Sequence, residues 1–250
     1  MIFRWTLWGI KQDHCEMLRY SIESFRKWFG KDQQYIVFTD DKNLVSKQLA
    51  RLADVRQFPN DKNTLFNIQS KATWLKWCPN SRLDISQTEF YIDSDVFLLK
   101  HPTEVFSFLS NEKQKFAVLD EFKGESWQHG AMKKKSLPET PFINAGFFIQ
   151  KASHDITPDL LNEFYWWKEN IKEEEHTHHD EQGCLAIALT KYLLNEELYI
   201  FPKEKYPLIS NDQNADKKNL DDVTLFHSTY PDHPAFYKFK FYLNKILNLE

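Results

Sequence analysis

The sequence predicts one α/β domain in which a central, mostly parallel mixed sheet is flanked by helices. Three observations support this fold class. Apolar runs of strand length alternate with segments of helical spacing, as in chains of successive strand, helix and strand units. The chain has 250 residues, enough for one large core. It contains no internal repeat, low-complexity segment or long linker that would divide it.

The first hundred residues predict strand, helix and strand in turn. Residues 2–9 form an apolar run, and residues 14–29 place apolar side chains at helical spacing before Gly30. The run "QYIVFTDD" reads as a buried strand that closes on acids. Further along, a short strand is expected at 52–58, a helix at 68–77 stopped by Pro79, and a strand at 90–92.

The same alternation continues to the C-terminus. A helix is expected from Pro102 to about Leu109, and the strand "FAVLDE" precedes a polar loop from Glu121 to Pro141. The strand "FINAGFFIQ" follows. The remaining expected elements are helices at 158–171 and 179–194, a strand at 223–227 and a helix at 235–248.

Composition narrows the class of protein. The chain has 32 Lys and Arg against 36 Asp and Glu, so its charge of −4 gives no electrostatic reason to expect a nucleic-acid partner. The cysteines Cys15, Cys78 and Cys184 are widely spaced and form no CxxC motif, which favours reduced thiols in a cytoplasmic protein. No apolar stretch reaches the length needed to span a bilayer.

Four acidic residues follow predicted buried strands: Asp40, Asp41, Asp93 and Asp95. In open α/β sheets ligands bind beyond the carboxyl ends of the parallel strands, so these carboxylates are expected to face a crevice. Two carboxylates at i and i+2 can converge on one hard divalent cation. The alternative is that acids at such positions cap the following turn or helix.

The segment "FYIDSDVFLLKHP" resembles the Asp-x-Asp segment of GT-A fold nucleotide-sugar glycosyltransferases. Four more stretches follow the order found in the retaining family that contains glycogenin and bacterial lipopolysaccharide galactosyltransferases. They are "IQSKATWLKW", "FINAGFFIQ", "HHDEQGCLAIAL" and "LFHSTYPDHPAF". The resemblance covers about residues 1–237. It implies a Rossmann-like GT-A domain with a nucleotide-binding half at 1–100 and an acceptor and sugar half at 101–237. Residues 238–250 are expected to form a C-terminal helical tail.

The resemblance also implies a set of site residues. A Mn²⁺ or Mg²⁺ ion would be held by Asp93, Asp95 and His227, and residues close to the reacting sugar would be Asn144, Asp180, Glu181 and Gln182. The implied reaction is transfer from a nucleotide sugar, expected to be a UDP-sugar, to a hydroxyl of a glycan, glycolipid or protein. The implied donor-binding residues are Trp8, Gly9, Asp40, Lys71, Asp93, Ser94, Asn144, Ala145, Gly146 and His233.

Two stretches depart from the family pattern. In the C-terminal one, Tyr230 stands in place of Gly and Ala235 in place of Trp, while His233 falls on the Lys that grips the donor phosphates. Aligning Gln182 with the Asp-Gln-Gly pattern puts Glu181 where the family has Asp, whereas aligning Asp180 displaces the glutamine. The roles of these acids, including a base at Asp180 or a nucleophile at Glu181, stay open at this stage.

The residues of the "FINAGFFIQ" strand carry a physical signal of their own. A Gly in an otherwise bulky strand suggests a bulge or the close approach of a ligand, and Asn144 is a polar residue in a run that should be buried. The alternative for Asn144 is a satisfied core amide. His176, His178 and His179 lie on a polar segment, where exposure is expected in preference to a metal site.

Two rival functions fit parts of the sequence. A haloacid-dehalogenase-like phosphatase would use Asp93 as nucleophile, with Asp212 and Asp216 as its late metal-binding acids. The long stretch before the motif, which contains predicted strands of its own, argues against it. A non-catalytic sugar- or protein-binding module would not explain the clustered acids.

The C-terminal tail interleaves aromatic residues with Lys238, Lys240 and Lys245. Packing on the core is favoured over peripheral contact with the inner face of a membrane, because an apolar stripe at helical spacing is usually core.

Overall fold

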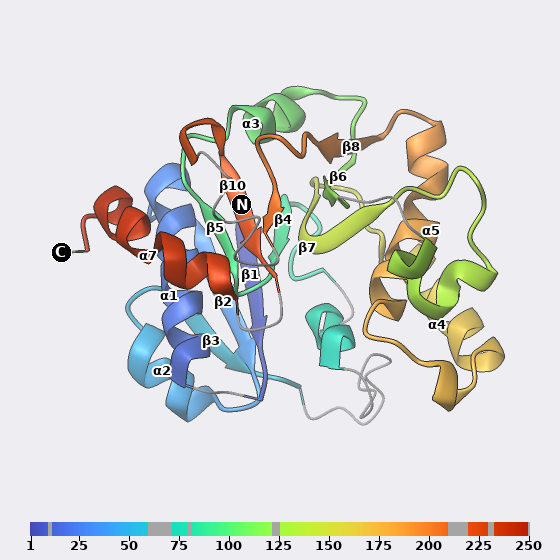
Figure 1. The fold of residues 1–250 in the computed structure, drawn as a ribbon, viewed down its shortest axis with the longest axis horizontal. Coiled ribbons are helices and arrows are strands. Elements are labelled where there is room, and N and C mark those ends of the chain that lie inside the picture. Colours follow the sequence, from blue (N-terminus) through green and yellow to red (C-terminus); the bar gives the residue numbers. More distant parts are fainter. Residues whose placement is uncertain are drawn as a thin grey trace.

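The fold is seen in a computed structural model that describes residues 1–9, 12–59, 72–79, 82–121, 126–209, 220–229 and 233–249. A seven-stranded sheet runs through the centre with the strand order β3-β2-β1-β4-β7-β6-β8 (Figure 1). β3, β2, β1 and β4 are parallel to one another, as are β6 and β8, while β7 runs antiparallel to β4 and β6. The mostly parallel mixed sheet predicted from the sequence is therefore confirmed. The strands are β1 (Ile2–Leu7), β2 (Gln34–Thr39), β3 (Asp54–Gln57), β4 (Glu89–Ile92), β6 (Phe116–Asp120), β7 (Ile143–Gln150) and β8 (Leu198–Phe201).

Helices flank this sheet, and alternate residues of its strands supply two separate cores. Phe147 and Ile149 of β7 belong to the core that includes side chains of α1, α2 and α3, whereas Phe148 between them belongs to the core of α4 and α5. This is the period of two expected of a strand that is buried on both faces. The helices are α1 (Gln12–Phe29), α2 (Lys42–Leu49), α3 (Thr103–Ser110), α4 (Thr157–Asn170), α5 (Asp180–Leu194) and α7 (Pro234–Leu247).

A second, three-stranded sheet lies beside the first and joins the C-terminal part of the chain to the middle. β10 (Leu225–Ser228) pairs antiparallel with β5 (Val96–Leu98) and parallel with β9 (Leu208–Ile209). The C-terminal helix α7 lies next to α1 in Figure 1. It packs through Phe236 and Leu243 on a core shared with β5, β10 and α1. The preference for core packing of this helix is thus confirmed, and membrane contact stays a prediction.

Several elements differ from the sequence-based expectation. The expected helix at 68–77 is seen over its described part as a 3₁₀ helix, η1 (Ala72–Trp77), and residues 68–71 lie outside the described ranges. The expected polar loop at 121–141 contains a 3₁₀ segment, η2 (Ser126–Lys134), whose Met132 is fully buried. Elements that the sequence analysis did not predict are α2, β5, β8, β9 and the short 3₁₀ turns η3 (Glu173–Glu175) and η4 (Leu220–Asp222).

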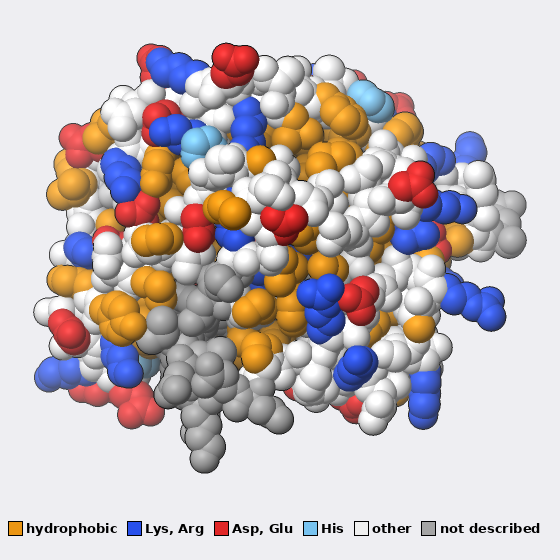
Figure 2. Space-filling view, turned by 180° about the vertical axis from the view of Figure 1, so that it is seen from behind, with side chains coloured by type: hydrophobic (Ala, Val, Ile, Leu, Met, Phe, Trp, Pro, Cys, Tyr) orange, Lys and Arg blue, Asp and Glu red, His pale blue; other side chains and the backbone are white. Residues whose placement is uncertain are grey.

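The surface shows no concentration of one charge on the face drawn in Figure 2, where basic and acidic side chains are scattered among apolar and uncharged ones. None of the helices that the structure describes combines the length and apolar character needed to cross a bilayer. Cys15, Cys78 and Cys184 are buried free thiols, as expected from their spacing.

The packing of α7 gives a testable expectation. Leu243 is fully buried, so Leu243→Ala should lower the free energy of unfolding by about 2 to 5 kcal/mol. Phe241 on the same helix is 76% exposed, and Phe241→Ala should change stability by less than about 0.5 kcal/mol. Urea unfolding of both variants checks this, and equal destabilisation by the two substitutions would contradict the packing of α7 on the core.

Candidate active site

The Asp-x-Asp segment forms a turn that joins the two sheets. β4 ends at Ile92, and the Asp93 N–H donates to the carbonyl of Gly146 at 2.8 Å. The chain turns through Ser94, and the Val96 N–H donates to the Asp93 carbonyl at 3.2 Å as β5 begins. Asp93 therefore lies at the carboxyl end of a parallel strand, and Asp95 enters the small sheet.

β10 brings His227 to this turn. His227 is opposite Val96 in the antiparallel ladder, and the Ser228 N–H donates to the Asp95 carbonyl at 2.9 Å. The His227 Nε2 is 3.2 Å from Asp95 Oδ1, and the His233 Nδ1 is 3.0 Å from Asp95 Oδ2. Asp95 thus lies between two histidines from the C-terminal part of the chain.

The electrostatics of Asp95 and His227 follow from this contact. Burial would raise the pKa of the Asp95 carboxyl, but the His227 charge and hydrogen bonds from both histidines outweigh burial and hold the pKa well below its usual range. Burial would lower the pKa of His227, but the neighbouring Asp95 and Asp93 carboxylates raise it. The site therefore favours the ionised carboxylate that a cation needs.

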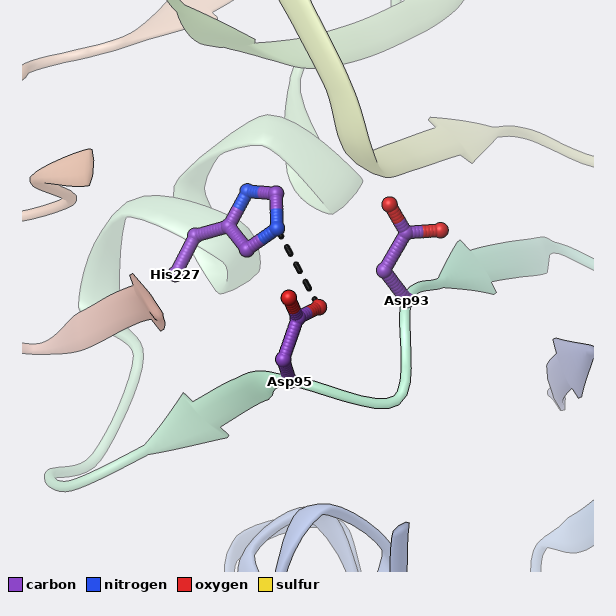
Figure 3. A group of neighbouring side chains, drawn as sticks. All are labelled: Asp93, Asp95 and His227. Atoms are coloured by element: carbon purple, nitrogen blue, oxygen red, sulfur yellow. Dashed lines mark ion pairs between the residues drawn. The ribbon is translucent and has the colours of Figure 1, made fainter. Parts of the chain in front are cut away.

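Asp93, Asp95 and His227 form a group that can hold a metal ion. Figure 3 shows their side chains turned toward a common space, and one ligand atom from each lies within 4.8 Å of the others. A six-coordinate ion with bonds of about 2.1 Å keeps its ligand atoms roughly 3 to 4 Å apart, so small side-chain rotations would complete the fit. Two carboxylates and an imidazole suit a divalent ion such as Mn²⁺ or Mg²⁺. The three expected metal ligands are thus brought together.

Lys76 is a site residue that the sequence analysis did not single out. Its side chain is buried, and Nζ lies 3.0 Å from Asp93 Oδ1 and 2.9 Å from the Ala145 carbonyl. Burial would lower the pKa of Lys76, but the Asp93 and Glu181 carboxylates raise it. The expected basic residue, Lys71, lies outside the described residues. No pattern in the sequence separates Lys76 from Lys71, because both lie in the run "IQSKATWLKW".

Glu181 and Gln182, at the start of α5, lie next to this cluster. Glu181 is buried and its Oε1 accepts a hydrogen bond from Trp77 Nε1 at 2.5 Å. Burial raises the pKa of the Glu181 carboxyl, although Lys76 and Trp77 act in the opposite direction. Gln182 accepts a hydrogen bond from the Ala145 N–H at 3.2 Å and donates one to the Gln128 carbonyl at 3.3 Å.

Unlike Glu181 and Gln182, Asp180 uses its side chain to connect neighbouring elements of the fold. Its Oδ1 accepts from the Ala131 N–H at 2.8 Å and the Thr177 hydroxyl at 2.6 Å, and its Oδ2 accepts from Trp167 Nε1 and the Thr177 N–H, both at 2.9 Å. The side chain has no exposed surface. Four hydrogen bonds use the acceptor capacity of the carboxylate, so its evident role is to join α5 to α4 and η2.

The expected donor-binding residues at the other strand ends also lie at the carboxyl edge of the sheet. Trp8 and Gly9 follow β1 and Asp40 follows β2, and the Gly9 N–H donates to Asp40 Oδ2 at 2.9 Å. Gly9 has φ +60°, a conformation that favours glycine. Asp41, by contrast, is the N-cap of α2 and accepts from the Leu44 N–H at 2.9 Å. The capping alternative thus holds for Asp41.

Asn144 and the segment beside it complete the cluster. Asn144 Oδ1 accepts from the Gly146 N–H at 2.9 Å and lies 3.0 Å from His227 Nδ1, while Nδ2 donates to Glu121 Oε2 at 3.1 Å. The register of β6 on β7 shifts between Val118 and Leu119, which agrees with the first of the two alternatives that the glycine suggested, a bulge or the close approach of a ligand. Ala145 contributes its backbone, as described above for Lys76 and Gln182.

The remaining candidates lie elsewhere. The rings of His176 and Trp167 are tilted, with centroids 4.2 Å apart. His178 is exposed as expected, whereas His176 and His179 are half-buried. No described group with metal-site spacing includes any of the three. Tyr230, Asp212 and Asp216 lie outside the described residues, and Ala235 is buried in the first turn of α7.

Comparison with known proteins identifies the fold. No protein-family model matches the chain, and no curated protein matches it by sequence. Among solved structures, the chain resembles the galactosyltransferase LgtC in complex with donor and acceptor sugar analogs, with a TM-score of 0.58 and 10% identity over 99% of this chain and 95% of that one. It also resembles an active-site mutant of LgtC, with a TM-score of 0.54 and 10% identity over 92% and 88% of the two chains.

A third solved structure, the apo form of mouse xyloside xylosyltransferase 1, matches with a TM-score of 0.54 and 12% identity over 90% of this chain and 96% of that one. These likenesses extend over nearly the whole chain. The fold is therefore the GT-A fold of nucleotide-sugar glycosyltransferases, as the ordered motifs suggested.

The contacts of Asp180 generate a prediction. Asp180→Asn would place an amide nitrogen against N–H or O–H donors that now face a carboxylate, so it should lower the free energy of unfolding by about 2 to 3 kcal/mol. Asp155→Asn is the control, because the half-buried Asp155 accepts a single described hydrogen bond, from the Thr157 N–H at 2.9 Å, and should cost about 1 kcal/mol or less. Urea unfolding distinguishes them. Wild-type stability in Asp180→Asn would contradict the structural role.

Proposed function

We propose that this chain is a glycosyltransferase that moves a sugar from a nucleotide sugar, expected to be a UDP-sugar, to a hydroxyl group of a glycan, glycolipid or protein. The observation that carries the proposal is the Asp93, Asp95 and His227 group at the carboxyl end of β4 within a GT-A fold. This is the edge at which open α/β sheets bind their ligands. The LgtC complex, which holds donor and acceptor sugar analogs, supports the same class of partners.

The proposed metal ligands are Asp93, Asp95 and His227, with Mn²⁺ or Mg²⁺ as the ion. When bound, such an ion would neutralise charge on the donor diphosphate and so make it a better leaving group. Two side chains of the protein contact these carboxylates, with Lys76 on Asp93 and His233 on Asp95. They hold the two ligands in place, and the Lys76 charge adds positive potential where the leaving group becomes more negative.

The proposed chemistry breaks the bond between the anomeric carbon and the β-phosphate oxygen. A new bond forms from the anomeric carbon to the acceptor oxygen, and the hydroxyl proton passes to the leaving phosphate oxygen. We propose retention of configuration for this transfer. Asn144, Glu181 and Gln182 are assigned to the sugar side, because Asn144 precedes Ala145, Gln182 accepts from the Ala145 N–H, and the Glu181 carboxylate interacts with the charge of Lys76. Asp180 supports this side by fixing the start of α5.

The metal part of the proposal is tested by Asp95→Asn. Asparagine keeps the shape but removes the charge, so metal-dependent donor hydrolysis or transfer should fall by about 10²-fold or more. Asp54→Asn, an exposed residue at the start of β3, is the control and should leave activity unchanged. Initial rates with and without Mn²⁺ measure the effect. If the Asp95→Asn variant keeps both its thermal transition and wild-type activity, the assignment of Asp95 to the site is wrong.

The donor is tested by ligand-induced stabilisation. A ligand that binds only the folded protein raises its apparent stability, by about 2.7 kcal/mol at a hundred times its Kd. Among nucleotide sugars with different bases, UDP-sugars should raise Tm most, and more with Mn²⁺ than with EDTA. Equal stabilisation by all bases would contradict the UDP assignment, and no shift with any nucleotide sugar would contradict the proposed donor class.

A further inference from the structure

The Asn144 side chain has an orientation that its neighbours fix. The Gly146 backbone N–H can only donate, so the atom 2.9 Å away must be the amide oxygen. The amide nitrogen at the other end then faces Glu121, whose Oε2 accepts from it at 3.1 Å. One donor and one acceptor from opposite sides therefore exclude the flipped amide.

The orientation of the Asn144 amide determines which ring nitrogen of His227 carries a proton toward Asn144 and which one faces Asp95. The Asn144 oxygen can only accept, so the His227 Nδ1, 3.0 Å from it, must carry a proton. The other ring nitrogen, Nε2, is the one directed at Asp95 Oδ1, 3.2 Å away (Figure 3). A histidine that binds a metal through Nε2 commonly donates its Nδ1 proton to a fixed acceptor, which sets the tautomer and the ring plane.

Gly146 supplies the space that this ring occupies. A Cβ at position 146 would lie 2.4 Å from His227 Cε1 and 2.5 Å from its Nδ1, far inside any allowed contact. The carbonyl of the same residue accepts the Asp93 N–H at 2.8 Å. Residues 144 and 146 thus act on two of the three expected metal ligands without donating a ligand atom themselves.

We propose that Glu121 and Asn144 form a positioning pair that holds the His227 ring with Nε2 toward the metal, and that Gly146 is glycine because the ring lies against it. The proposal rests on the function proposed above, since it concerns the same metal group. It gives Glu121 a role that no motif indicated, and it gives the Asn-x-Gly segment a role in building the metal site. Asn144 therefore acts on the metal site through His227 and is not itself a ligand.

The decisive experiment compares three variants for Mn²⁺ affinity, measured from the free-ion EPR signal. Asn144→Leu keeps the side-chain size but removes the acceptor, and should raise the Kd for Mn²⁺ about 10- to 100-fold, the usual effect of losing a partner of a metal ligand. Gly146→Ala retains Asn144 but would place a Cβ against the His227 ring and 2.9 Å from Asn144 Oδ1, and should raise the Kd by a similar factor. Asn170→Leu, the same substitution at an exposed site on α4, should leave the Kd unchanged.

A charge-conserving exchange separates positioning from packing. In the double variant Glu121→Gln/Asn144→Asp the amide and the carboxylate change places. The new amide at position 121 would donate to the new carboxylate at position 144, and an acceptor for the His227 Nδ1 proton would remain. The Kd of this exchange variant for Mn²⁺ should stay within about threefold of wild type, because the ring keeps its partner. An unchanged Kd in Asn144→Leu, or equal loss in the exchange variant and Asn144→Leu, would overturn the pair.

A second measurement decides the inference independently of metal binding. ¹⁵N-histidine NMR of the metal-free protein, assigned with His227→Gln, should show an exchange-protected Nδ1 proton on His227 in wild type and in the exchange variant, and none in Asn144→Leu. Absence of that proton in wild type would refute the pair. A wild-type protein that keeps the proton but binds no Mn²⁺ would instead refute the metal centre and leave the hydrogen-bonded pair standing.

Discussion

The candidate site depends on one departure from regular sheet structure, the bulge in β7. β7 pairs with β4 up to Phe147 opposite Ile92, but its ladder with β6 jumps from Phe148 to Asn144. Residues 145–147 therefore have no partners on β6, and their backbone groups are available for other contacts. The Ala145 carbonyl accepts from Lys76 and the Ala145 N–H donates to Gln182, while the Gly146 carbonyl accepts from Asp93 and so continues the ladder with β4. A strand without the bulge would use the Ala145 groups in its ladder with β6.

A buried charge network places Lys76 within reach of this bulge. Arg4 on β1 pairs with Glu89 on β4 at 2.9 Å, and both side chains are almost fully buried. The same guanidinium donates to the carbonyls of Lys76 and Cys78, at 3.3 and 3.1 Å. Arg82 adds a second cation to Glu89. Buried pairs of this kind contribute little net stability, but breaking one is costly, so the network is better explained by the segment that it fixes.

The sequence predicted the parts of the fold that depend on local pattern. The long apolar runs of β1, β2, β4 and β7 were found, because a strand buried on both faces needs continuous apolar residues. β5 was missed since its three residues become a strand only by pairing with β10, more than a hundred residues later. The buried Met132 of η2 was likewise hidden in a segment whose composition is polar. Pairing and burial of this kind are tertiary effects.

The same distinction applies to the site. Asp93, Asp95 and His227 were grouped in advance through the resemblance of their segments to a known family, whereas the residue pattern alone placed only the two aspartates at the end of a buried strand. Lys76 could not be distinguished from Lys71, because both lie in the same stretch of sequence and the contacts of Lys76 with Asp93 and Ala145 are tertiary. The role of Asp180 was equally hidden, since its partners Trp167 and Ala131 come from distant elements. Sequence indicated which residue types could act, and the tertiary contacts decide which of them face the cluster.

The C-terminal helix α7 helps to position residues of the candidate site. The Phe236 N–H at the start of α7 donates to the Ser228 hydroxyl at the end of β10, at 3.0 Å. The Ser228 N–H in turn donates to the Asp95 carbonyl, and His233, just before α7, reaches both the Ser228 carbonyl and Asp95. Phe236 and Leu243 bury this helix against a core that includes Tyr20 of α1. The apolar packing of α7 thus adds to the β5 ladder and to the burial of Leu225 in the main core in fixing the positions of His227 and His233.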